Sequence, residues 1–195
     1  MARPRNFDED TVVAAAREQF WNRGYTATSV DDLAAATGLG KSSLYGAFGD
    51  KRSLYLRTLD EYCSGAMDNV VEQLREPGPP AMERLARHIR AIAADVAADS
   101  SRRGCMMAKS SAELGAADAD VDRMISASLA RWREALVDTI EEAKRDGALA
   151  AATDPQALAT LLLSVIRGFE TLRIGGVEPA QISAAAEQAV AMLST

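Results

Sequence analysis

The stretch from Thr28 to Lys51, TSVDDLAAATGLGKSSLYGAFGDK, constrains the fold more than any other part of the chain. Its pattern predicts two short helices, the second from Lys41 to Phe48, joined by the turn Thr37-Gly38-Leu39-Gly40. Glycine takes the left-handed backbone conformation that ends a helix at low steric cost. Two short helices with a glycine-containing turn, over about residues 29–48, are typical of a helix-turn-helix.

The first of these two helices is predicted to begin near Ser29, with Thr28 as its cap. The Thr28 hydroxyl would accept the amide of Asp31, whose carboxylate lies in the first turn, where the helix dipole favours negative charge. Leu44 and Phe48 lie four residues apart and form the predicted buried side of the second helix.

The other side of this pair of helices carries hydroxyls and cations suited to phosphates and base edges. The candidate DNA-contacting residues are Thr28, Ser29, Lys41, Ser42, Ser43, Tyr45 and Lys51. The alternative is a solvated helical hairpin that carries a lysine and serines without binding anything.

The segment RGYTATSVDDLAAATGLGKSSLYGAFGDKRSLY and the helix before it strongly resemble the N-terminal DNA-binding domain of TetR-family transcriptional regulators, over roughly residues 7–60. The resemblance implies that Lys41–Phe48 is the recognition helix and that Lys51 lies against a phosphate. The residues at positions that usually touch DNA are Lys41, Ser43 and Tyr45. Two positions depart from the family pattern: Gly40 replaces a capping Ser, and Gly46-Ala47 replaces bulky aromatic or His residues.

Alanine and leucine dominate the chain, and the period-two alternation of strands is absent, so an all-α fold is predicted. We expect a helix-turn-helix DNA-binding domain over residues 1–52 and a helical ligand-binding and dimerisation domain over residues 53–195. The nine predicted helices cover about residues 8–23, 29–36, 41–48, 50–75, 79–99, 105–114, 118–146, 155–173 and 179–193.

The location of the protein is expected to be the cytoplasm. No apolar run approaches the ~20 residues of a membrane span, and the N-terminus MARPRNFDED has no apolar signal region. Two isolated cysteines in a chain with 48% hydrophobic residues suggest a reducing compartment. We predict no membrane partner and no cofactor.

The net charge of −6 is unevenly distributed. Residues 1–52 carry seven Lys and Arg and seven Asp and Glu, so the whole negative excess lies after residue 52. Four cations near the proposed DNA face, Lys41, Lys51, Arg52 and Arg57, are predicted to face one acid, Asp50, which is expected to cap the next helix. Arg3 and Arg5 suggest either an arm on DNA or a frayed, solvated terminus.

The predicted helix over residues 155–173 is apolar on most of its surface and must therefore bury two faces. One face would pack on the core and the other on a second subunit, together with the last helix. The predicted dimer interface is Leu161, Ser164, Gly168, Leu172, Ile182, Ala186 and Val190. Such a homodimer would present two recognition helices about 34–36 Å apart to a pseudo-palindromic operator on double-stranded DNA.

Ten residues of the second domain are predicted to line a pocket for an unknown small-molecule effector, because they are mostly apolar with few polar anchors. They are Tyr62, Met67, His88, Ile92, Met106, Met107, Met124, Trp132, Ile166 and Phe169. For each of them, plain core packing is the alternative.

The resemblance implies a DNA-binding transcriptional regulator whose helix over residues 50–75 links the two domains and swings when a ligand binds. We therefore expect a repressor released by its effector, with this helix as the lever. One alternative is a thiol or metal sensor that uses Cys63, Cys105 and His88, because the Arg102 and Arg103 charges would favour a Cys105 thiolate. Another is an interaction bundle that does not bind DNA. An enzyme is not expected, because no nucleophile motif is recognisable.

Overall fold

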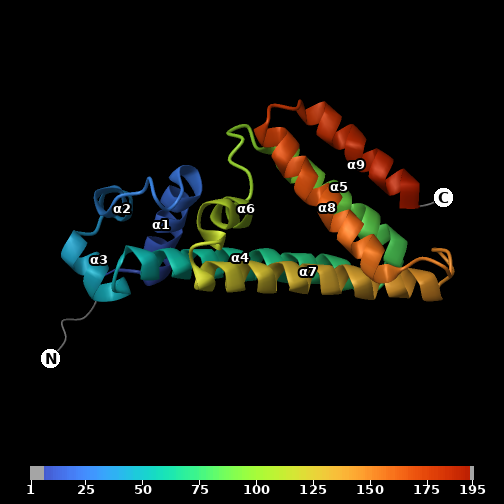
Figure 1. Cartoon of the computed structure of the whole chain (residues 1–195), viewed down its shortest axis with the longest axis horizontal. Helices are drawn as coiled ribbons and strands as arrows, with labels where there is room; N and C mark the ends of the chain where they lie inside the picture. Colours follow the sequence, from blue (N-terminus) through green and yellow to red (C-terminus); the bar gives the residue numbers. More distant parts are fainter. Residues whose placement is uncertain (1–6, 194–195) are drawn as a thin grey trace. The chain divides into compact units, whose positions relative to one another are not determined.

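The computed structural model describes residues 7–193, and over this range the chain contains α-helices, one short π-helix and no strand (Figure 1). The all-α fold is therefore as predicted. The elements are α1 (Glu9–Arg23), α2 (Val30–Thr37), α3 (Lys41–Phe48), α4 (Lys51–Arg75), α5 (Ala81–Ala98), α6 (Met106–Ser110), η1 (Ser111–Gly115), α7 (Ala119–Arg145), α8 (Pro155–Ile174) and α9 (Pro179–Leu193).

Local capping signals set most of these bounds. The Asp8 carboxylate accepts the amide of Asp10 at the start of α1, and Gly24, with φ of 81°, follows its last residue. Asp154 accepts the amides of Gln156 and Ala157 at the start of α8. Capping side chains satisfy the unpaired backbone amides at the start of a helix, and glycines let the backbone turn away at its end. Both residue types can be recognised in the sequence, so these helix ends are predictable.

One predicted helix differs from the structure. The segment expected to form a single α-helix over residues 105–114 is divided into α6 and the π-helix η1, Ser111–Gly115. A π-helical turn is rare and is frequently found at functional sites.

The described chain forms two compact units. The first contains the described residues up to Cys63 together with Met106–Ile125, and the second contains Ser64–Cys105 with the residues from Ser126 onward. Both α4 and α7 contribute to each unit. The predicted functional boundary at residue 52 stays a prediction.

The first unit is built on the inner side of α1, which packs against the start of α4. The Phe20 ring meets the Tyr55 ring edge-on, with centroids 5.1 Å apart. Leu33 of α2 and Leu44 of α3 are also buried. The apolar sides of α2 and α3 are thus turned inward, which leaves their polar sides exposed.

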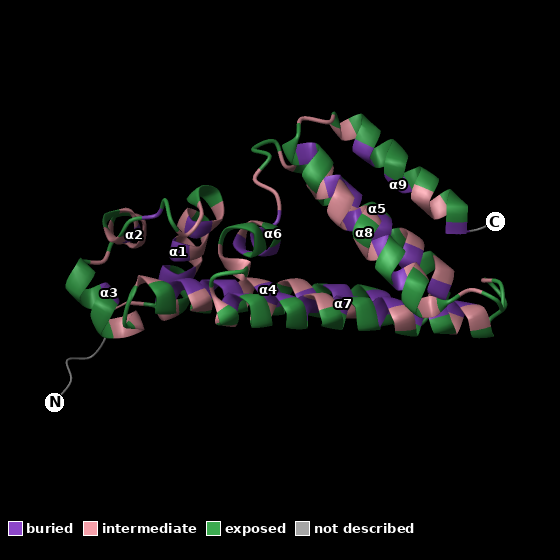
Figure 2. Cartoon of the chain, viewed as in Figure 1, coloured by how far each residue is buried: buried purple, intermediate pink, exposed green. Residues whose placement is uncertain are grey.

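In the second unit, α5 packs against both α8 and α9 (Figure 1). Buried and exposed residues alternate along α8 and α9 (Figure 2). The buried residues of these three helices include Leu85, Ile89, Ala93, Ala159, Leu162, Ile166, Phe169, Ile182, Ala186 and Leu193. None of the helices in residues 7–193 combines the length and the apolar character of a membrane span.

Candidate nucleic-acid interface

The helix-turn-helix consists of α2, the turn Gly38–Gly40 and α3. Ser29 and Asp32 form a reciprocal capping box at the start of α2: the Ser29 hydroxyl accepts the Asp32 amide at 3.1 Å, and the Asp32 carboxylate accepts the Ser29 amide at 2.8 Å. Hydrogen bonds from Ser29 lower the pKa of Asp32 to about 2. Gly38, with φ of 70°, ends α2 in the left-handed conformation.

The predicted role of Thr28 as the cap is wrong. Thr28 is fully buried, and its hydroxyl donates to the Gly24 carbonyl at 2.6 Å. Its side chain therefore has no surface with which to contact DNA. Ser29, one residue further on, is exposed, but the capping box already engages its hydroxyl.

The outer side of α3 presents the polar residues that the sequence placed there. Lys41, Ser42, Ser43 and Tyr45 are exposed, with 46% of the Tyr45 surface accessible. Gly40 precedes α3 and makes no side-chain cap hydrogen bond at the positive end of the helix. Hydroxyls, a cation and a helix N-terminus together suit phosphate oxygens.

Tyr45 and Lys51 line one shallow hollow of the first unit, although they belong to different helices. The hollow has a volume of about 220 Å³, which includes space open to solvent, and its other lining residues are Val30, Leu33, Leu44, Phe48, Asp50 and Leu54. The Lys51 ammonium lies over the Tyr25 ring, 4.2 Å from its centroid. The structure thus brings the predicted contact residues of α3 and α4 to one place.

Lys41 has an acidic partner, Asp31, that was not predicted. The Lys41 ammonium lies 2.7 Å from the Asp31 carboxylate, and their side chains are 54% and 78% exposed. The hydrogen bond to Asp31 raises the pKa of Lys41, so the ammonium remains charged. Asp31 thus places a negative charge on the face proposed to meet phosphates.

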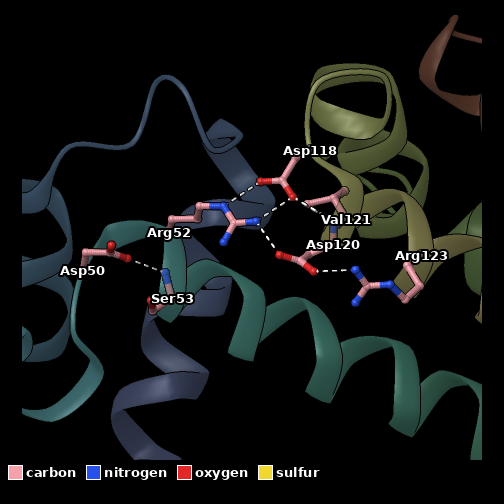
Figure 3. A network of polar contacts seen from close by, with 7 residues as sticks. All are labelled: Asp50, Arg52, Ser53, Asp118, Asp120, Val121 and Arg123. Carbon is pink, nitrogen blue, oxygen red and sulfur yellow. Dashed lines mark hydrogen bonds and ion pairs between the residues drawn. The ribbon is translucent and has the colours of Figure 1, made fainter.

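The expectation that four cations face only Asp50 is wrong. Arg52 binds Asp118 through two nitrogens, at 2.7 and 2.8 Å, and Asp120 at 2.7 Å (Figure 3). Arg57 pairs with Glu9 at 3.2 Å. Asp50 accepts the Ser53 amide at 2.7 Å and thus caps α4, as predicted (Figure 3). Lys41 and Lys51 are the two of these cations on the proposed face, while Arg3 and Arg5 lie outside the described residues.

The bidentate Arg52–Asp118 pair is electrostatically strong. The Arg52 guanidinium lowers the pKa of Asp118 to about 2, aided by the amides of Val121 and Asp120 at the start of α7. No local sequence pattern predicts this contact, because the partners are 66 residues apart.

The ten tentative effector residues are divided between the two units. Tyr62, Met106, Met107 and Met124 belong to the first, and Met67, His88, Ile92, Trp132, Ile166 and Phe169 belong to the second. Only Tyr62, Ile92 and Met124 are intermediate in exposure, whereas the others are buried. An effector-contacting role for them stays a prediction.

His88 is a hydrogen-bonded core histidine. Its Nε2 accepts the Trp132 indole N–H at 3.0 Å, and its Nδ1 lies 2.9 Å from the Gln73 side-chain oxygen. Because an indole N–H only donates, Nδ1 carries the proton and donates to Gln73. Burial lowers the pKa of His88 to about 4, so the ring is neutral and both nitrogens are occupied.

The residues behind the sensor alternative receive no support as a metal site. Cys63 and Cys105 are both buried, and residues 7–193 contain no group of three or more His, Cys, Asp or Glu side chains placed to hold a metal ion. The ring nitrogens of His88 are also engaged elsewhere.

The predicted dimer residues divide by burial. On α8, Leu161 and Leu172 are 57% and 48% exposed, Ser164 is exposed and Gly168 is intermediate. On α9, Val190 is intermediate, but Ile182 and Ala186 are buried within the second unit, where α9 packs on α5. Ile182 and Ala186 therefore have no surface for a partner subunit, and those two assignments are corrected.

A capped helix-turn-helix with a polar outer face, joined to a second helical unit, defines a helix-turn-helix DNA-binding protein. The model of the bacterial regulatory proteins of the tetR family matches residues 12–58, and that of the tetracyclin repressor-like C-terminal domain matches residues 81–174. The chain belongs to the TetR family of transcriptional regulators, a family of DNA-binding regulators and not of enzymes.

Individual relatives agree with this assignment. The chain is 28% identical to the HTH-type transcriptional repressor ComR of Escherichia coli, over 86% of this chain and 80% of ComR. It is 30% identical to the uncharacterized HTH-type regulator YezE of Bacillus subtilis, over 83% and 84%. A cysteine mutant of the TetR-family regulator CifR, solved with 26-bp double-strand operator DNA, superposes with a TM-score of 0.85 at 29% identity, covering 98% of this chain and 100% of CifR.

Proposed function

We propose that this protein is a cytoplasmic, homodimeric repressor that leaves its operator when a small apolar or amphipathic molecule binds the C-terminal domain, residues 53–195. The observation that carries the DNA-binding part is the exposed face of α3, where Lys41, Ser42, Ser43 and Tyr45 stand around the buried Leu44. Ser29 and Lys51 complete the proposed contact set, and all these residues precede the proposed domain boundary at residue 52.

Dimerisation in this proposal uses the outer side of α8. Leu161 and Leu172 are large apolar residues that a folded monomer leaves in water, and Ser164 and Gly168 between them allow a second helix to approach closely. A homodimer formed through this face would carry two copies of α3, one for each half of a pseudo-palindromic operator.

The effector must favour the DNA-incompetent state to act as an inducer. A tenfold loss of operator affinity requires about 1.4 kcal/mol of coupling between the two sites. The long helix α4 supports such coupling, because it begins at Lys51 beside the DNA face and continues into the second unit. The effector itself would be found by a thermal-shift screen, followed by loss of operator binding as the second readout.

The DNA-binding proposal is tested with duplexes from the upstream region of the protein's own gene, by fluorescence anisotropy over a salt series. Lys41→Ala and Tyr45→Ala should each weaken operator binding by about tenfold, and Lys41→Ala should also make the salt dependence less steep by about one unit per subunit. Arg133→Ala, which removes an exposed cation of the second unit, is the matched control and should bind like wild type. Wild-type binding by both α3 variants would show that the face is assigned wrongly.

A further inference from the structure

The loop between α1 and α2 is held by one carboxylate from a distant part of the chain. Glu113 of η1 accepts the amide of Tyr25 at 2.9 Å and the amide of Thr26 at 2.6 Å, each with a different carboxylate oxygen. Two adjacent backbone donors bound to one charged acceptor form a strong, orienting contact.

The backbone at Gly24 is shaped for this contact. Gly24 has φ of +81°, and a Cβ placed on it would lie 2.7 Å from the nearer Glu113 oxygen. A residue other than glycine would be strained by the backbone angle, and its Cβ would force the Glu113 carboxylate to move. The loop conformation and the position of Glu113 depend on one another.

The segment that carries Glu113 is fixed to the first unit at three further points. Lys109 donates to the Trp21 carbonyl at 3.0 Å, near the end of α1, and the Tyr55 hydroxyl donates to Ser110 at 2.7 Å within the core. Beyond η1, Asp118 binds Arg52 at the start of α4 (Figure 3). These contacts hold η1 in place, so its carboxylate is presented to the loop at a fixed position.

The charge on Glu113 is also maintained. Burial opposes its ionisation, but hydrogen bonds from Thr26 and from the Tyr25 amide outweigh burial and hold the pKa of Glu113 below its usual value. The acceptor is therefore a carboxylate at neutral pH, which makes both hydrogen bonds charge-assisted.

The loop fixed by Glu113 is connected to the start of the helix-turn-helix within a few residues. The Gly24 carbonyl accepts the hydroxyl of the buried Thr28, and Ser29 next to it begins the capping box of α2. The orientation of α2, and of α3 packed on it, therefore depends on the backbone that Glu113 fixes.

We propose that Glu113 is a positioning residue for DNA binding: it preorganises the loop that sets α2 and α3, without contacting DNA. This inference rests on the proposed recognition face. A recognition face that is already ordered in the free protein loses less conformational entropy when it binds DNA. Loss of the carboxylate should therefore weaken operator binding.

The test compares Glu113→Gln with Asp122→Asn in the full-length protein. Both remove one negative charge from the first unit, but Asp122 is an exposed residue whose side chain makes no hydrogen bond or ion pair in the described structure. Operator affinity is measured by anisotropy over a salt series, and hydrogen exchange is measured for the peptide that contains Tyr25 and Thr26.

We expect Glu113→Gln to bind the operator about tenfold more weakly than Asp122→Asn, since a hydrogen bond to a charged group is worth at least that factor. The salt dependence should match that of Asp122→Asn, because no phosphate contact is lost, and exchange at Tyr25 and Thr26 should become faster. Equal affinity of the two variants would overturn the proposal, as would unchanged exchange.

A second variant, Glu113→Asp, tests the proposal even if Glu113→Gln folds poorly. Glu113→Asp keeps the charge but shortens the side chain, so it should also weaken operator binding and speed exchange. Binding like wild type by Glu113→Asp would overturn the proposal. If the wild-type protein itself binds no duplex, the proposed recognition face fails, and the exchange measurement alone then decides whether Glu113 orders the loop.

Discussion

Replacing Asp31 with Asn should make the protein bind DNA more tightly. In the structure the Asp31 carboxylate holds the Lys41 ammonium at 2.7 Å, on a face where both side chains are mostly exposed. The substitution removes a negative charge from this face and releases Lys41, the first residue of α3, for a phosphate. Wild-type Lys41 has to exchange Asp31 for DNA, whereas the variant does not.

The size of the effect follows from the strength of an exposed ion pair. Lys41 contacts a phosphate in both proteins, so the slope of log affinity against log salt should change little. Wild type must break one Lys41–Asp31 pair in each subunit, and exposed pairs of this kind are weak. The dimer of the variant should therefore bind the operator about two- to thirtyfold more tightly. Because salt screens exposed pairs, the gain in affinity should be largest at low salt.

Fluorescence anisotropy with the operator duplex measures specific binding, and the same measurement with an unrelated duplex measures non-specific binding. Non-specific binding should increase as much as operator binding, because phosphates carry no sequence information. Asp122→Asn again provides the control for the change in net charge. Affinities equal to those of Asp122→Asn on both duplexes would refute the reasoning, because Lys41 would then gain nothing from losing its partner.

Two further outcomes are expected. The pKa of His88 is about 4 in the folded protein and 6.5 in the unfolded chain, so the folded state binds fewer protons between these pH values. The free energy of unfolding of the protein should therefore fall by about 3 kcal/mol as the pH is lowered from 6.5 to 4. Urea unfolding of wild type and His88→Gln across that range checks this, since parallel curves would contradict it. Leu161→Glu and Leu172→Glu should produce monomers that bind the operator weakly, measured by light scattering and anisotropy, whereas Ala130→Glu on the exposed side of α7 should remain dimeric.

The sequence predicts well those features that are determined within a few residues. Gly24 and the pair Asp154 and Pro155 mark helix ends by local capping, and the predicted bounds of α3 agree with the structure residue for residue. The prediction of Thr28 as the cap is wrong because Thr28 is buried, which leaves the neighbouring Ser29 hydroxyl to cap α2. Asp32, three residues after Ser29, is the local sequence signal of this capping box.

Features that depend on residues far apart in the chain could not be predicted in this way. Glu113 and its loop are separated by 87 and 88 residues, and no local pattern connects them. The division of α9 into inner and outer faces has the same cause. Ile182 and Ala186 fit either face by helical periodicity, and only the packing of α9 on α5 turns them inward.

The first unit is not a continuous piece of sequence, because residues 106–125 return to it after the chain has built part of the second unit. Recombination that exchanged only the first sixty residues between two relatives would therefore separate Tyr25 and Arg52 from Glu113 and Asp118. A functional chimera has to inherit both segments from the same parent.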